Sequence, residues 1–101
     1  MHERLRIELI IERMAYKRAG RILEDAGMTG YTVLPAFAGF GNGNRWSRDT
    51  DISSSSDMVV IISIGSEDRV SAALEQISSL LGNHIGVVST SPVSVLRPDR
   101  F

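Results

Sequence analysis

Cysteine is absent from this chain of 101 residues, and lysine is nearly absent. Without a thiol, the protein can form no disulfide, no cysteine-bound zinc site and no thiol nucleophile. Lys17 is the only lysine, so arginine supplies almost all of the positive charge. The net charge of −1 argues against a nucleic-acid-binding protein, because such proteins normally carry a basic excess.

Long apolar runs are also missing. No run approaches the ~20 residues that a membrane-spanning helix needs, and charged residues interrupt the apolar stretch at the N-terminus, unlike in a signal peptide. We therefore expect a cytoplasmic protein without direct membrane insertion. Its length fits a single domain over residues 1–101.

Two periodicities organise the chain. Leu5, Ile7, Leu9 and Ile11 alternate with charged residues, which predicts a half-buried strand. A helical spacing of apolar residues recurs in two other segments, each ended by a glycine, and Ser66 is placed to cap the second. The predicted order is a strand at 5–12, a helix from about Ala15 to Gly27, a strand at 31–37, a strand at 58–64, a helix at 66–82, a strand at 85–90 and an extra short strand at 93–96.

This order predicts an α+β protein of the ferredoxin-like (βαββαβ) class, in which two helices cover one face of an antiparallel sheet. The strand at 58–64 is apolar on both sides, with Val60, Ile62 and Ile64 opposite to Val59 and Ile61. Strands of this kind belong to sheets that are covered on both faces. Because the two helices cover only one face, we expect further copies of the chain to cover the other.

Residues 38–57 form the longest stretch without periodicity. Gly39, Gly41 and Gly43 alternate there, and Arg45 and Arg48 follow, on either side of Trp46. Glycine amides and arginine forks together make a candidate anion-binding loop. The spacing matches neither a dinucleotide fingerprint nor a P-loop. A solvated loop without a ligand, and a Trp46 that packs back onto the domain, remain alternatives.

The segment Asp25-Ala26-Gly27-Met28-Thr29-Gly30-Tyr31-Thr32-Val33, followed by the glycine- and arginine-bearing loop, resembles the PII superfamily of signalling proteins. It resembles more closely the PII-like branch associated with bicarbonate transporters and carboxysomes. The resemblance implies a homotrimer without enzymatic activity, which binds an adenine nucleotide (ADP or AMP, with ATP less favoured) in clefts between subunits. It also implies that residues 38–57 are a T-loop that docks a membrane transporter or carboxysome-related protein.

The same resemblance assigns residues to the nucleotide. The positions that it places around base, ribose or phosphate are Thr29, Gly30, Tyr31, Ser63, Ile64, Ile85, Gly86, Val87, Val88 and Arg100, and those that it places on a phosphate or other anion from the T-loop are Gly41, Arg45 and Arg48. Residues 85–88 are assigned to the neighbouring subunit's wall of the cleft. Bicarbonate near the nucleotide is a further expectation, with the two loop arginines as its ligands.

The chain departs from the pattern of classical PII proteins in two ways, and both affect which regulation and which nucleotide we expect. The loop has no tyrosine for uridylylation, and the turn Leu81-Gly82-Asn83-His84-Ile85-Gly86 has no phosphate-binding lysine. Fewer phosphate donors favour AMP or ADP over ATP.

Other chemistries find less support in the sequence. An acylphosphatase-like or other phosphate-ester-processing enzyme on the same fold would need an arginine-centred cradle after the first strand, where the chain reads Glu12-Arg13-Met14-Ala15. An RNA-binding sheet needs aromatic residues on its central strands, and there are none. His84 is interpreted as a solvated turn or helix-end histidine rather than a general base, and Asp49, Asp51 and Asp57 match no metal-binding spacing, so no metal is expected.

Overall fold

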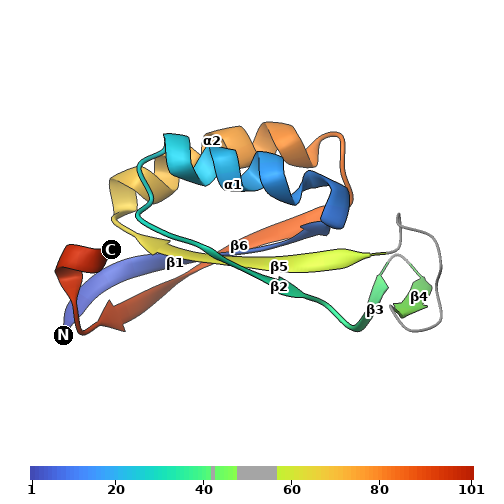
Figure 1. Cartoon of the computed structure of the whole chain (residues 1–101), viewed down its shortest axis with the longest axis horizontal. Coiled ribbons are helices and arrows are strands. Elements are labelled where there is room, and N and C mark those ends of the chain that lie inside the picture. Colours follow the sequence, from blue (N-terminus) through green and yellow to red (C-terminus); the bar gives the residue numbers. More distant parts are fainter. Residues whose placement is uncertain (42, 48–56) are drawn as a thin grey trace.

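A computed structural model describes residues 1–41, 43–47 and 57–101, without the side chain of Asn44. A four-stranded antiparallel sheet carries two helices on one face (Figure 1). The sheet order is β2-β5-β1-β6, and a separate two-stranded sheet consists of β3 and β4. The elements are β1 (His2–Glu12), α1 (Tyr16–Asp25), β2 (Thr32–Pro35), β3 (Ala38–Gly41), β4 (Asn44–Ser47), β5 (Met58–Gly65), α2 (Glu67–Leu81) and β6 (Gly86–Val95), with short 3-10 helices at Arg13–Ala15 and Pro98–Arg100. The predicted ferredoxin-like fold is confirmed.

The alternation along β1 sets the core. Ile7, Leu9 and Ile11 are fully buried and face the helices, whereas Arg6, Glu8 and Ile10 lie on the opposite face. β1 occupies a central position and pairs with both β5 and β6. The core therefore forms between this strand and the helix layer.

Both helices bury a narrow stripe against the sheet. α2 buries Val70, Ala73, Ile77 and Leu80, at the spacing expected of one helix face. The Ser66 side chain accepts a hydrogen bond from the Arg69 amide at 3.4 Å, which confirms the predicted cap. α1 ends before Gly27, whose φ of 90° is the left-handed conformation that favours glycine.

The C-terminal strands differ from the prediction. Residues 85–90 and 93–96 were expected as two strands joined near Ser91 and Pro92, but β6 is one strand of ten residues. β6 is an edge strand, with β1 as its only neighbour in the sheet. An edge strand tolerates a proline because one row of its backbone groups needs no ladder partner.

Within residues 38–57, for which the sequence predicted no strand, the described residues form a hairpin. β3 and β4 pair antiparallel, and Gly43 turns between them with a φ of 75°. Gly39 faces Trp46, and a Cβ at Gly39 would lie 2.6 Å from the Trp46 ring. Trp46 is half-buried and packs within the hairpin. Periodicity did not predict this hairpin, because the hairpin does not pack one face against the core, and alternation of apolar and polar residues arises from such packing.

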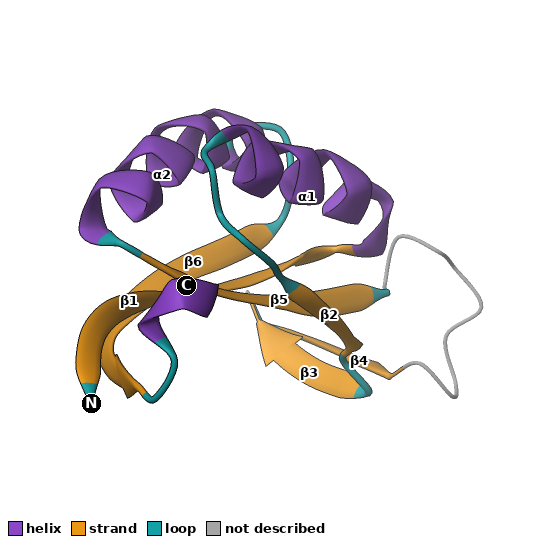
Figure 2. Ribbon diagram, turned by 60° about the vertical axis from the view of Figure 1, so that its left-hand side comes forward, coloured by secondary structure: helices purple, strands orange, loops and turns teal. Residues whose placement is uncertain are grey.

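No helix covers the second face of the sheet in the described part of the chain (Figure 2). Register places Leu34, Val60 and Ile10 side by side on this face, followed by Val87 on β6. Leu34 and Val87 are exposed. We call this surface, with Ile62 and Ile64, the open face.

Candidate functional site

Four of the predicted nucleotide-binding residues meet at one corner of the fold. This corner lies where the α1–β2 turn, the end of β5 and the C-terminal 3-10 helix come together (Figure 1). The Ser63 hydroxyl donates a hydrogen bond to the Gly30 carbonyl at 2.6 Å. Ser63 is only 2% exposed. The Thr29 hydroxyl donates to the Arg100 carbonyl at 2.5 Å. Side-chain hydrogen bonds thus fix the backbone of the turn and of the C-terminal segment.

Arg4 holds the C-terminal segment from the start of β1. Its Nε donates to the Phe101 carbonyl at 3.0 Å, and one terminal nitrogen donates to the Pro98 carbonyl at 3.4 Å. The Arg100 side chain itself is 64% exposed, and its nearest acid, Asp99, is 4.0 Å away. A pair at this distance in solvent is weak, so the Arg100 guanidinium can bind an anion at this corner.

Only the backbone of Tyr31 lies at this corner. Its hydroxyl donates to Glu24 Oε2 at 3.2 Å on α1, and a Cβ at Gly20 would lie 2.7 Å from the Tyr31 ring. The hydrogen bond to the Glu24 carboxylate raises the pKa of Tyr31 above 10.0. The Tyr31 side chain is therefore engaged with the helix layer.

Ile85, Gly86, Val87 and Val88 lie at the opposite end of the sheet from this corner. Ser63 pairs with Ile7 and Gly86 pairs with Ile11, so Gly86 is displaced from Ser63 by four residues along β1, or about 13 Å, on the other side of that strand. One chain does not bring these two predicted groups together. Gly86 also has a structural role, because a Cβ there would lie 2.6 Å from the Ile10 carbonyl oxygen.

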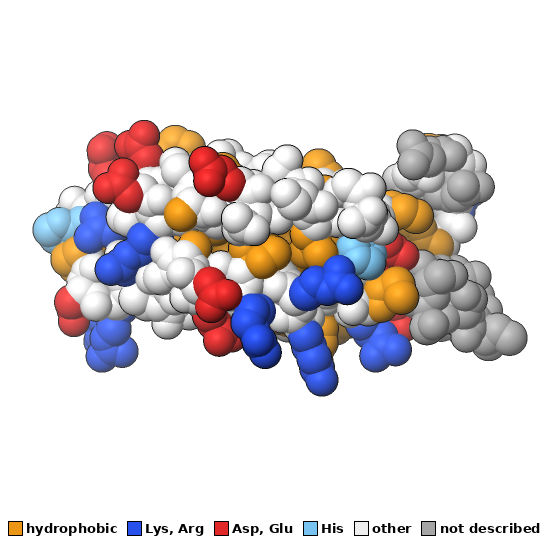
Figure 3. Space-filling view, turned by 90° about the horizontal axis from the view of Figure 1, so that it is seen from above, with side chains coloured by type: hydrophobic (Ala, Val, Ile, Leu, Met, Phe, Trp, Pro, Cys, Tyr) orange, Lys and Arg blue, Asp and Glu red, His pale blue; other side chains and the backbone are white. Residues whose placement is uncertain are grey.

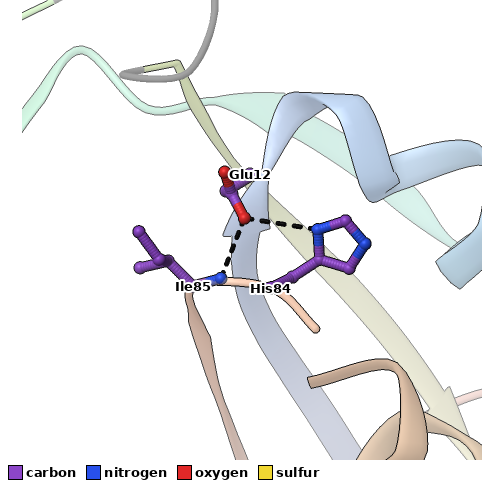
Figure 4. Close-up of polar contacts among 3 residues, drawn as sticks. All are labelled: Glu12, His84 and Ile85. Carbon is purple, nitrogen blue, oxygen red and sulfur yellow. Dashed lines mark hydrogen bonds and ion pairs between the residues drawn. The ribbon is translucent and has the colours of Figure 1, made fainter. Parts of the chain in front are cut away.

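The turn before β6 contains a polar contact that the sequence did not indicate (Figure 4). Glu12 Oε1 accepts a hydrogen bond from the Ile85 amide at 2.8 Å and contacts His84 Nδ1 at 3.3 Å. The side chains of Glu12 and His84 are each 12% exposed, so His84 lies in a turn at the end of α2, as predicted, but is not solvated. The two residues are 72 positions apart, and no local spacing could have paired them.

The T-loop residues are only partly described. Arg45 is exposed on β4, and its guanidinium carbon lies 5.9 Å from the centre of the Phe40 ring, within cation–π range. Gly41 ends β3, and a Cβ there would have open space around it. Arg48 lies outside the described residues, as do Asp49 and Asp51.

The described residues include no group of three or more histidine or acidic side chains that could hold a metal ion. Nor does the described part of the chain contain a helix of the length and apolarity needed to cross a membrane.

Comparison with known proteins identifies the family. Residues 4–100 match the family model of nitrogen regulatory protein P-II. A sequence search of curated proteins finds no match. The fold is similar to CPII, a nitrogen regulatory PII-like protein from Thiomonas intermedia, solved with ADP, AMP and bicarbonate bound. The TM-score is 0.89 at 26% identity, covering 99% of this chain and 94% of that chain.

A second structure of CPII, bound to ADP and bicarbonate, has a TM-score of 0.87 at 27% identity, and covers 99% of this chain and 95% of that chain. A PII-like signalling protein from Thermus thermophilus shares the fold, with a TM-score of 0.81 at 21% identity, and covers 99% of this chain and 96% of that chain. The family match spans nearly the whole chain, from β1 to the C-terminal 3-10 helix. The chain therefore belongs to the nitrogen regulatory protein P-II family.

Proposed function

We propose that this protein is a non-enzymatic signalling protein of the PII-like branch, which binds an adenine nucleotide between the subunits of a homotrimer. The similarity to CPII, solved with ADP, AMP and bicarbonate, carries the proposal. The corner formed by Thr29, Gly30 and Ser63 supports it, because these predicted residues lie together. In the proposed site this corner, with Ile64 and Arg100, forms one wall, and residues 85–88 of a neighbouring subunit form the other.

The open face supports the trimer. Leu34, Val60, Ile10 and Val87 form an apolar row across this face, and Ile62 and Ile64 of β5 lie next to the Glu8–Arg6 ion pair. Contiguous apolar surface of this kind on a small protein marks an interaction site. Three copies that bury their open faces together would cover it, and would bring the two distant groups of site residues together across subunit boundaries.

The turn before β6 favours nucleotides with few phosphates. The Ile85 amide already donates a hydrogen bond to the Glu12 carboxylate, which therefore lies beside it. A carboxylate repels phosphate oxygens, and an occupied amide cannot donate to them. We therefore expect AMP and ADP to bind more tightly than ATP. Arg45 and Arg48 would contribute positive charge from the T-loop, to a phosphate or to bicarbonate.

In this proposal, residues 38–57 bind the partner protein that receives the signal. Phe40, in the β3–β4 hairpin, and Phe37, the residue before the hairpin, are exposed. Exposed aromatic residues are common in protein interfaces. We propose that this T-loop docks a membrane transporter for bicarbonate or a carboxysome component in the cytoplasm, in response to the bound nucleotide. A gene for such a partner beside this one would support that assignment.

Calorimetry of the purified full chain with AMP, ADP, ATP and bicarbonate tests the proposed function. We expect saturable binding of AMP and ADP, weaker binding of ATP, and no rapid release of phosphate. Sedimentation of the same sample should give a trimer. A stable monomer without affinity for any adenine nucleotide would refute the proposal, whereas rapid hydrolysis would favour the phosphate-processing enzyme instead.

A further inference from the structure

The outer side of α1 and of the 3-10 helix before it is strongly basic. Arg13, Lys17 and Arg21 follow one another at intervals of four residues, and Arg18 lies next to them. All four residues are exposed. Residues four apart project from the same side of a helix. We call these four residues the basic flank.

The acidic residues that alternate with these arginines in the sequence do not neutralise them. Glu8 pairs with Arg6 on the sheet, and Glu24 accepts from Tyr31. Within the described part of the chain, Lys17, Arg18 and Arg21 form no hydrogen bond or ion pair, and Arg13 pairs with Asp57 at 3.3 Å. Seen from above the helix layer, basic side chains gather along one edge, with acidic side chains beside them on that edge and others on the opposite side (Figure 3). The acidic side chains at the end of α1 are Glu24 and Asp25.

Helix stability does not explain the basic flank. α1 has no acidic residue in its first turn and no basic residue in its last, whereas α2 begins with Glu67 and Asp68. Positive side chains near a helix start oppose the helix dipole, at a cost of a few tenths of a kcal/mol or more each. A local feature that costs stability is commonly found where function requires it.

A shallow pocket of roughly 190 Å³ adjoins the start of the basic flank. Its walls are Val33, Pro35 and Val59 with the Tyr16 ring, and Arg13 lies at its edge. Met14, between the pocket residues Arg13 and Tyr16 in sequence, is 74% exposed. Arg13 thus belongs to both features. An apolar recess at the paired Arg13, one helical turn from Lys17, which is unpaired among the described residues, suits a ligand with an apolar group and several negative charges.

We propose that the basic flank and its pocket dock an acidic segment of a partner protein, with one apolar side chain of that segment in the pocket. Charge complementarity argues for such a partner. An anionic membrane fits less well, because stable adsorption takes clusters of about four to eight basic residues or a broad apolar helix face, and three unpaired cations with one exposed methionine provide neither. This surface adjoins the proposed nucleotide site at Arg13, which follows Glu12 in the chain, but the proposal does not depend on nucleotide binding.

The probe for this proposal is a short fluorescein-labelled peptide of glutamate and aspartate with one central leucine. We expect its fluorescence anisotropy to rise on binding to the full chain without nucleotide, and the affinity to fall with added salt. Replacement of the leucine by serine should weaken binding several-fold, because the pocket then gains no apolar contact. Binding of both peptides with equal affinity would overturn the role of the pocket.

The double variant Lys17→Glu with Arg21→Glu should weaken binding of the leucine peptide roughly tenfold. Lys17→Glu places an acidic residue in the first turn of α1, where the helix dipole favours it. Arg21→Glu lies one turn before Glu24 and Asp25 and costs a little helix stability through like-charge repulsion, so circular dichroism of the double variant must show that the fold is retained. Arg69→Glu, on the exposed side of α2, is the matched control and should bind as the parent does. AMP calorimetry on the double variant should be unchanged.

Two results would overturn the proposal. The first is a peptide affinity that the double reversal leaves unchanged. The second is tighter binding to phosphatidylserine vesicles than to the peptide, since that would assign the basic flank to a membrane.

Discussion

The carboxylate of Glu12 accepts a hydrogen bond from the backbone amide of Ile85 at 2.8 Å, although the two residues are 73 positions apart in the chain. This contact joins the end of β1 to the turn before β6. It satisfies an amide donor that would otherwise face solvent or a ligand, and it leaves a negative charge in the same place. The preference that we propose for AMP and ADP over ATP rests on this contact and on the absence of a lysine from the turn.

Glu12→Gln should raise the affinity for ATP relative to AMP by roughly three- to tenfold. Glutamine retains an oxygen that can accept from Ile85 but removes the charge. Calorimetry with both nucleotides measures the ratio. Glu75→Gln, which removes an exposed charge from α2, is the control and should leave the ratio unchanged. An unaltered ratio in Glu12→Gln would show that Glu12 does not select among phosphates, even if the protein binds AMP.

Ser63→Ala should destabilise the fold by about 1 kcal/mol, because the Gly30 carbonyl loses its hydrogen-bond partner at a buried position. Urea denaturation monitored by circular dichroism measures the loss. We also expect weaker AMP binding, since the Gly30 turn is no longer fixed. Ser71→Ala on the exposed side of α2 is the matched control. Normal stability and normal AMP affinity in Ser63→Ala would remove the proposed role of this hydrogen bond.

Tyr31 should ionise at higher pH than an ordinary tyrosine, because its hydroxyl donates to Glu24. The folded state then holds the Tyr31 proton more tightly than the unfolded state does. Its contribution to stability is complete below pH 10.0 and is lost as the pH rises through the raised pKa of the folded state. Tyrosinate absorbance measures the titration. Glu24→Gln should return the Tyr31 pKa towards its ordinary value; a titration that does not respond to this change would contradict the contact.

Ile62→Glu should convert the proposed trimer into monomers, because it adds a second carboxylate beside Glu8, whose own charge is paired with Arg6, and the subunit contact would have to bury it unpaired. Sedimentation velocity distinguishes the two species. Gln76→Glu adds the same charge on the exposed side of α2 and should leave the trimer intact. Nucleotide affinity should be lost together with the trimer, since the proposed cleft needs two subunits; a monomer that still binds AMP at parental affinity would place the site within one chain.

Arg45→Ala combined with Arg48→Ala should weaken the protection of residues 38–57 from limited proteolysis that we expect on nucleotide binding. The two guanidinium groups are the basic side chains of the T-loop, so their removal takes away its charge-assisted bonds to an anion. Mass spectrometry of the cleavage products with and without ADP gives the comparison. If ADP protects the variant as well as the parent, the T-loop arginines do not contact the ligand.

Periodicity predicted the elements whose side chains face a single core. β1 alternates over Ile7, Leu9 and Ile11, and α2 repeats over Val70 and Ile77, because burial on one side imposes the period of the element. The β3–β4 hairpin escaped prediction because it does not bury a face on the core. The continuous β6 also escaped it, since Pro92 signals a break unless the strand is known to lie at a sheet edge.

The sequence by itself determined the fold class and the family, because both depend on local periods and on a contiguous motif around Thr29 and Gly30. Tertiary structure alone decided which charges are paired. Glu12 reaches His84 and Ile85 across the sheet, while Lys17 and Arg21 find no acidic partner among the described residues. Ion pairing depends on distances between residues that are remote in the chain, and no spacing along the sequence records those distances.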